Sequence, residues 1–326
     1  TADVVKLAEK YFGSIPRCPN VTPVKLDPVV LDKDRYVSYV DNYARASQLR
    51  LVYPTVRDYD PDDAALSCLA QVLGGGGGFG GGGGRGGRGG GGGENHNSIF
   101  YQTLIKSQKA LQASASSQLS ELAGEFSVSI TPYPGKSLAE MEQLINEVYT
   151  EFEKRGVTDD DIERFKNEFE SRTINGLASV SGKVSQLAAF QTFTSNPNMI
   201  KKLLDANSKL TKEDVMRVYN KYIKEKPHVV LSTLAKSQEN LIAKEDDYTV
   251  DMTHYKAPDY GYDGLKYEKA KDNFDRSKIP GNGPNPIVKV PAFWRKDLPN
   301  GIKMIGTENS EIPTITISIT IPGGHL

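Results

Sequence analysis

The chain has 326 residues, of which 25% are charged and 38% are hydrophobic, and its formal net charge is −1. It is long enough for more than one domain, and its near-zero charge gives no reason to expect nucleic acid or a polyanionic surface as a partner. Two cysteines, Cys18 and Cys68, are too few for a disulfide framework, and no apolar run approaches the roughly 18 residues that span a bilayer.

The two ends of the chain predict a helix and a strand. From Val4 to Phe12 apolar residues recur at helical spacing, and Gly13 follows them. Over 315–321 every second residue is Ile, alternating with Thr and Ser as in a half-buried strand. The helix has no initiator Met before it, and the strand has no following partner. We therefore interpret the chain as part of a longer polypeptide.

The middle of the chain predicts an α+β arrangement, with strands first and helices afterwards. Alternating segments indicate strands over 35–40 and 48–56. Acidic residues and Pro61 then suit the start of a helix that stops at Gly74. The next predicted elements are a short helix over 98–107 and a hairpin over 110–120 and 124–135.

Three later helices are indicated by their capping residues. In each, a hydroxyl is followed three residues later by a carboxylate, which satisfies free N–H groups of the first turn. The pairs are Ser137 with Glu140, Thr158 with Asp161, and Thr211 with Asp214. Apolar residues at helical spacing follow each pair, so each helix has a face to bury. A last strand is predicted over 228–235.

The composition changes after the last of these strands. From about Lys244 to Val290 the chain is rich in Asp, Lys, Tyr, Gly and Pro and keeps neither helical nor strand periodicity. We interpret this stretch as an interdomain linker. A strand, turn and strand pattern resumes beyond it, with Asn300 and Gly301 at the turn.

Several segments together carry a resemblance to the pitrilysin/insulinase family of zinc metallopeptidases. In chain order they are "KYFGSIP", "DYDPDDAALSCLAQVLGGG", "IFYQTLIKSQKALQASASS", "GEFSVSITPYPGKSLAEMEQLINE" and "GVTDDDIERFKNEF". The later "DLPNGIKMI" and "TITISITIPGG" resemble the start of that family's second homologous half. No single motif is diagnostic of the family, and the specificity of the resemblance comes from the order and spacing of these segments.

The resemblance implies a fold and a domain plan. The fold is α+β, an antiparallel sheet covered by helices, with partial domains on either side. The implied divisions are 1–28 as the end of a first peptidase-like domain, 29–244 as a second, inactive domain with a glycine-rich insertion at 74–93, 245–290 as the linker, and 291–326 as the truncated start of a third domain.

The family's chemistry requires an inverted H-x-x-E-H helix, in which two histidines hold zinc and the Glu activates water. The chain has four histidines, and none falls in that spacing: His96, His228, His254 and His325. The resemblance therefore implies that this chain has no catalytic residue, no metal ligand and no cofactor of its own. Zinc is expected in the full-length parent.

The implied function is that of a non-catalytic section of a zinc-dependent metallopeptidase. It forms part of the chamber that encloses a peptide or unfolded polypeptide substrate. Its partners are the remaining domains of the parent or a second subunit, and no nucleic acid or membrane span is expected. For a bacterial member, the family favours the periplasm or secretion. The alternative is a zinc-free structural homologue, because the family includes members that have lost the metal.

The glycine-rich tract of 74–93 admits several interpretations. A phosphate-binding loop is disfavoured, because no Lys-Ser or Lys-Thr follows and the tract comes after a helix rather than a strand. RNA binding through "RGGRGG" has suitable chemistry, but two arginines give little electrostatic affinity at physiological salt. A disordered insertion without function, or a stand-in for residues of uncertain identity, remains open.

A substrate-binding loop is the other open interpretation. "LGGGGGF" resembles the start of the glycine-rich loop in the α subunit of mitochondrial processing peptidase, a member of the same family, although the tract here is longer and nearly pure glycine. Exposed glycine N–H and C=O groups suit main-chain contacts with an extended peptide. The candidate substrate-binding residues are Gly74, Gly75, Gly76, Gly77, Gly78, Phe79, Arg85 and Arg88.

Overall fold

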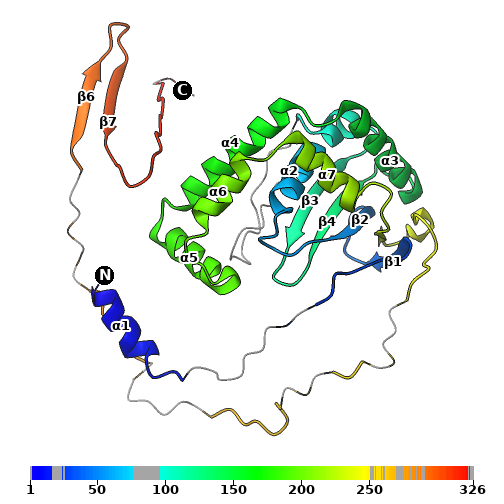
Figure 1. Ribbon diagram of the computed structural model, residues 1–326, viewed down its shortest axis with the longest axis horizontal. Coiled ribbons are helices and arrows are strands. Elements are labelled where there is room, and N and C mark those ends of the chain that lie inside the picture. The colour runs from blue at the N-terminus through cyan, green and yellow to red at the C-terminus, as the bar shows by residue number, and fades with distance from the viewer. Residues whose placement is uncertain are drawn as a thin grey trace.

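The computed structural model describes residues 2–16, 24, 26–75, 96–249, 291–321 and 323, together with scattered residues between 253 and 287. The predicted linker, 245–290, is therefore described only in part. Figure 1 shows the helices and strands of the central part gathered around one sheet, with α1 and the β6–β7 hairpin apart from it. None of the helices in the described part of the chain is long and apolar enough to cross a membrane.

The central sheet has five strands in the order β1-β5-β2-β4-β3. Their bounds are β1 Arg35–Asp41, β2 Gln48–Thr55, β3 Gln112–Leu119, β4 Gly124–Thr131 and β5 Val229–Ala235. Neighbouring strands run antiparallel, except that β1 runs parallel to β5. The α+β fold class predicted from the sequence is confirmed. The parallel pair arises because β5 enters the sheet between β1 and β2 after a long helical segment.

Alternation along β2 explains why the sheet has one apolar face. Leu49, Leu51 and Tyr53 are 0%, 1% and 2% exposed, and their partners on β4 are also buried apolar residues. The residues between them point to the opposite face and are only partly buried. Because successive side chains of a strand point to opposite faces, this period of two fixes the register of β2 against β4.

The helices cover that apolar face. Buried side chains of α2, α3, α4 and α7 join those of the strands in one hydrophobic core. The bounds are α1 Ala2–Phe12, α2 Asp63–Leu73, η1 Tyr101–Ile105, α3 Leu138–Arg155, α4 Asp159–Gly176, α5 Val180–Thr194, α6 Ile200–Ser208, α7 Lys212–Tyr222 and η2 Glu239–Leu241. The outlying hairpin consists of β6 Phe293–Asp297 and β7 Lys303–Thr307.

The three predicted capping pairs are confirmed. Ser137, Thr158 and Thr211 each begin a helix, and each hydroxyl accepts from the main-chain N–H three residues later. The carboxylate at that third position accepts in return from the N–H of the capping residue, which completes a capping box. The starts of α3, α4 and α7 are therefore set by local sequence.

The structure differs from the sequence-based expectations in three places. Helices α5 and α6 were not predicted, and the sparse burial of α5, limited to Ala189 and Phe190, explains the weak pattern. The short helix expected over 98–107 contains a π-helical turn, η1. The strand expected over 315–321 pairs with no strand among the described residues, and its isoleucines are 80% to 90% exposed. A strand without a neighbour lacks the hydrogen bonds that hold it.

Candidate substrate-facing edge

The glycine-rich tract leaves the fold at the C-terminal end of α2, where Gly74 lies against β3. The Gly74 N–H donates to the Ala70 carbonyl at 2.9 Å. A Cβ atom placed on Gly74 would lie 2.0 Å from the main-chain nitrogen of Ala115 on β3. Because that neighbour is backbone, no side chain fits without moving the strand. Gly74 is thus required by the contact between the helix end and the sheet.

Gly75 completes the exit from the helix. Its N–H also reaches the Ala70 carbonyl, at 3.2 Å, and its φ is +66°, in the left-handed region that favours glycine. The chain therefore turns away from the α2 axis at this residue. Of the predicted binding residues, Gly74 and Gly75 are described, whereas Gly76, Gly77, Gly78, Phe79, Arg85 and Arg88 lie outside the described residues.

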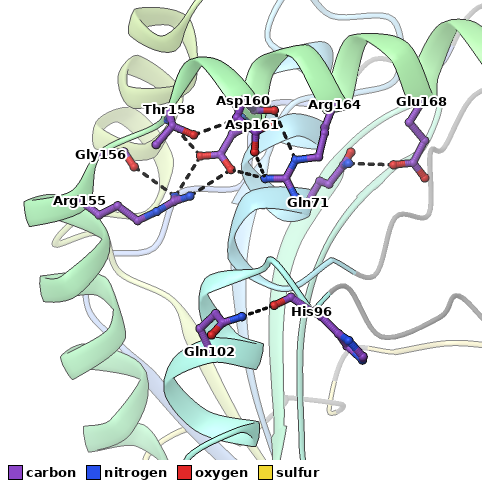
Figure 2. Close-up of polar contacts among 10 residues, drawn as sticks. All are labelled: Gln71, His96, Gln102, Arg155, Gly156, Thr158, Asp160, Asp161, Arg164 and Glu168. Atoms are coloured by element: carbon purple, nitrogen blue, oxygen red, sulfur yellow. Dashed lines mark hydrogen bonds and ion pairs between the residues drawn. The ribbon is translucent and has the colours of Figure 1, made fainter.

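The chain re-enters the described fold at His96, next to η1. The His96 ring stacks on Tyr101, with ring centroids 4.3 Å apart and 20° between the planes. Figure 2 shows the Gln102 side chain, whose Nε2 donates to the His96 carbonyl. Ser98 is buried, and its hydroxyl accepts from the Tyr101 N–H at 3.2 Å. The return of the tract is therefore held by side-chain contacts rather than by a glycine.

The π-helical turn connects this return to β3. The Lys106 N–H donates to the Tyr101 carbonyl at 2.8 Å, and the Lys109 N–H donates to the Leu104 carbonyl at 2.8 Å. Leu104 is buried beneath the turn. Single π-helical turns in proteins occur frequently at functional sites. Both ends of the tract thus lie next to the same strand, one through Gly74 and the other through η1.

Strand β3 is an edge of the sheet, so one side of its main chain has no strand partner among the described residues. Ala115 and Ser117 face the core and are buried, whereas Ser114 and Gln118 are exposed. The Ser116 hydroxyl lies 3.0 Å from that of Ser127 on β4. This edge offers small, uncharged side chains, which leave room for the main chain of an extended peptide.

Helix α4 packs beside α2. The Gln71 side chain donates to Glu168 at 2.8 Å, which ties the last turn of α2 to α4 (Figure 2). At the start of α4, Asp161 is buried and forms ion pairs with Arg155 at 3.0 Å and Arg164 at 3.1 Å. Burial opposes its ionisation, but hydrogen bonds from Arg155 and Thr158 hold the pKa of Asp161 below its usual value. The Asp161–Arg155 ion pair holds α4 against the end of α3, and the polar contact of α4 with α2 is the Gln71–Glu168 hydrogen bond.

The two described histidines, His96 and His228, lie in separate aromatic contacts. His96 stacks on Tyr101, and His228 stacks on Tyr53 with ring centroids 4.6 Å apart. His254 and His325 lie outside the described residues. Within the part of the chain that the structure describes, no three His, Cys, Asp or Glu side chains are placed to hold a metal ion. The described residues therefore do not form the donor set of a peptidase zinc site.

Sequence reasoning located the tract but missed what holds it in place. Nothing in the sequence signals that Gly74 must lie against Ala115, because that contact joins residues from different elements. The one local signal was the stop of an apolar helical pattern at a glycine. The aromatic residue Tyr101, five residues after His96, is consistent with their stacking but does not predict it.

Comparison with known proteins identifies the family. The family described as "Peptidase M16 inactive domain" matches residues 1–169. The chain belongs to this family. Its resemblance to pitrilysin-like peptidases, seen in the sequence, is thereby confirmed, as is its place among the inactive domains of the family. A search of the curated proteins finds no match.

Solved structures share the fold of this M16 inactive-domain protein. A protease from Helicobacter pylori has a TM-score of 0.58 at 18% identity, covering 72% of this chain and 52% of its own. A peptidase M16 inactive domain from Pseudomonas fluorescens has a TM-score of 0.53 at 18% identity, covering 71% and 50%. The ferredoxin protease FusC, solved as a mutant with Arabidopsis ferredoxin, has a TM-score of 0.50 at 17% identity, covering 72% and 24%. The chain spans about half the length of the first two structures.

Proposed function

We propose that this chain is a non-catalytic section of a larger zinc-dependent peptidase and forms part of the wall around its polypeptide substrate. The parent hydrolyses peptide bonds with a zinc-bound water, and the zinc ligands come from outside this chain. One observation supports this proposal: the chain belongs to the M16 inactive domains.

The α2–β3 edge, defined here as Gly74, Gly75 and strand β3, is the part that faces the substrate. The observation that carries this assignment is the contact of Gly74 with the Ala115 main chain, which roots the tract beside an edge strand. Glycine main-chain groups can bind an extended peptide regardless of its side chains. Arg85 and Arg88 would add attraction for acidic residues of the substrate.

The occupant of this edge is an extended or partly unfolded polypeptide. The structure of FusC holds that protease together with a protein, ferredoxin, which supports polypeptide handling by proteins of this fold. The remaining domains of the parent, or a second subunit, complete the enclosure. In this plan residues 29–244 form the inactive domain, 1–28 and 291–326 belong to its neighbours, and 245–290 link them.

The test is the kinetics of the full-length parent with residues 76–92 deleted. The deletion should raise KM for long peptides more than for short ones, because only a long peptide reaches from the active site to the tract. A matched variant replaces the same residues by a Gly/Ser linker of equal length without Arg85 and Arg88. If KM for long peptides returns to its original value in that variant, the main chain of the tract binds the substrate. If KM stays raised, the arginines do. Unchanged kinetics for both peptide lengths would overturn the proposal.

A further inference from the structure

Strand β1 forms the edge of the sheet opposite β3, and its outer side carries unpaired main-chain groups. The Arg35 N–H points inward and donates to the His228 carbonyl at 3.0 Å. The main-chain groups of Tyr36 point outward. Its N–H donates to Asp247 Oδ1 at 2.7 Å, and its carbonyl accepts from the Asp247 N–H at 3.1 Å. Because these groups alternate along a strand, those of Ser38 and Val40 also point outward.

The outward groups of Ser38 and Val40 have no partner in the described part of the chain. Natural edge strands are commonly protected by Pro, Lys, a bulge or a covering segment. The segment from Tyr36 to Val40 reads "YVSYV" and contains none of the protective residues. Tyr39 and Val40 are 50% and 40% exposed. This edge is therefore a ready template for another strand.

Asp247 shows that one end of this edge already bonds to another segment of the chain. Besides its two bonds to Tyr36, its carboxylate lies 3.5 Å from the Lys33 ammonium. The next residue, Tyr248, places its ring under the Arg35 guanidinium, 5.5 Å from the ring centroid. This pairing involves only Tyr36 of the outward-facing residues. Farther along the edge, the outward main-chain groups of Ser38 and Val40 have no partner among the described residues.

We propose that the outer edge of β1, from Ser38 to Val40, binds an extended stretch of substrate polypeptide as an added strand. The identity of this occupant rests on the proposed function. Main-chain hydrogen bonds to Ser38 and Val40 supply the affinity and make the site tolerant of sequence. Alternate side chains of the added strand lie next to Val37 and Tyr39 on the face away from the core. The site therefore favours stretches with apolar residues at every second position and without proline.

The α2–β3 edge and the β1 edge are two separate contact points for one polypeptide. Three strands lie between them, so they are roughly 20 Å apart across the sheet. A short peptide occupies one edge at a time, whereas a long unfolded chain reaches both. A long polypeptide bound at both edges would have a higher affinity than a short peptide bound at either edge alone, because its second binding event is intramolecular.

The test measures binding of a short labelled peptide, in which Thr and Ile alternate, to the full chain by fluorescence anisotropy. Val40→Pro removes one outward N–H without touching the β1–β5 ladder, and proline is tolerated at such edge positions. We expect it to weaken binding about fivefold or more, the effect of losing a main-chain hydrogen bond. The matched variant Val40→Ala keeps the N–H and should bind within about twofold of the unmodified chain. Asp247→Ala removes the carboxylate that holds the Tyr36 N–H, although the Tyr36 carbonyl keeps its bond to the main-chain N–H of residue 247, and it should tighten binding.

Amide hydrogen exchange of the unmodified chain gives a second measurement that needs no variant to fold. The peptide should slow exchange at Ser38 and Val40 and leave Val37 and Tyr39 unchanged, because the inward groups are already bonded to β5. A peptide N-methylated at alternate residues should have no effect. Equal binding by Val40→Pro and Val40→Ala, or no protection at Ser38 and Val40, would overturn the inference.

The same titration separates this inference from the proposed function. Deleting residues 76–92 should leave short-peptide binding at β1 unchanged, although it alters the kinetics of the parent with long peptides. If the deletion abolishes short-peptide binding, the peptide binds at the tract and the β1 assignment is wrong. If the deletion leaves the parent kinetics unchanged while β1 is protected, the proposed role of the tract fails and the β1 site stands.

Discussion

The two ends of α2 are held in different ways. At the N-terminal end Asp62 is buried and accepts from Arg217 at 2.7 Å, Lys221 at 2.9 Å and the Tyr222 hydroxyl at 2.7 Å, all from α7. At the C-terminal end Gly74 can lie close to the main chain of β3 because it has no side chain. The first end depends on charge, and therefore on pH and salt, whereas the second depends on close packing. The glycine-rich tract is attached to the end that charge does not control.

Gly74→Ala should produce the largest effect, because it places a Cβ atom 2.0 Å from the Ala115 main-chain nitrogen. Backbone must move to relieve this clash, and overpacking of this kind costs about 3 kcal/mol. Urea denaturation of the chain measures the change in the free energy of unfolding. The control is Gly176→Ala at the end of α4, where a Cβ atom would meet nothing within 4 Å and the change should stay within about 1 kcal/mol. Equal stability of the two variants would show that close packing does not hold this end of α2.

Asp62→Ala should produce the second largest effect by leaving Arg217, Lys221 and Tyr222 of α7 without their shared acceptor. We expect a loss of about 2 kcal/mol in the free energy of unfolding, reduced from the value for a fully buried pair because the two cations are half exposed. The loss should shrink in high salt. Asp160→Asn is the control, since Asp160 is exposed and its pair with Arg164 contributes about 0.5 kcal/mol. A salt-independent loss would contradict the electrostatic role of Asp62.

The pH dependence of Asp62 can be stated with its sign. Burial opposes ionisation, but bonds from Tyr222, Lys221 and Arg217 hold the pKa of Asp62 below its usual value. Its stabilising contribution is therefore present above the unfolded pKa and is lost as pH falls through the folded pKa. The unmodified chain should lose stability in acid more steeply than Asp62→Ala. Parallel acid-denaturation curves would show that this carboxylate does not stabilise the fold.

Asp63, the next residue, should show the opposite dependence. Burial and the neighbouring carboxylates of Asp58 and Asp60 raise its pKa to about 7. The folded state then binds a proton more tightly than the unfolded state, so stability should fall as pH rises from about 4 to about 7. The slope for one group is on the order of 1 kcal/mol per pH unit over that interval. Asp63→Asn should remove this slope in thermal melts taken across the interval, whereas Asp160→Asn should leave it unchanged. A slope that persists in Asp63→Asn would assign it to another group.

These two ends also mark what the sequence could and could not predict. The start and stop of α2 followed from acidic residues, Pro61 and Gly74, because such signals act within one turn of a helix. The capping boxes of α3, α4 and α7 were predictable for the same reason. The partner of Asp62 on α7 lies 155 residues away, and no local pattern specifies it.

The arrangement of the sheet and the root of the tract depend on contacts of that distant kind. The insertion of β5 between β1 and β2 brings together segments separated by the whole helical region. The contact of Gly74 with Ala115 could likewise not be predicted from the sequence, because a glycine after a helix is explained equally well by the end of the helix alone. The family resemblance predicted a substrate-binding site at the tract, but only the packing of Gly74 against β3 explains why we expect a larger residue there to destabilise the fold.

His96→Ala should produce the smallest effect, because it removes one stacking contact on Tyr101 at the return of the tract and leaves α2 untouched. We expect a loss of less than about 1 kcal/mol in the free energy of unfolding. The more sensitive measurement is amide hydrogen exchange, which should rise in η1 and remain unchanged at Gly74. The matched variant His96→Phe keeps an aromatic ring and should keep the protection of η1. If hydrogen exchange also rises at Gly74, the contact of Gly74 with β3 and the stacking of His96 on Tyr101 are coupled through β3. The two ends of the tract are then not held independently.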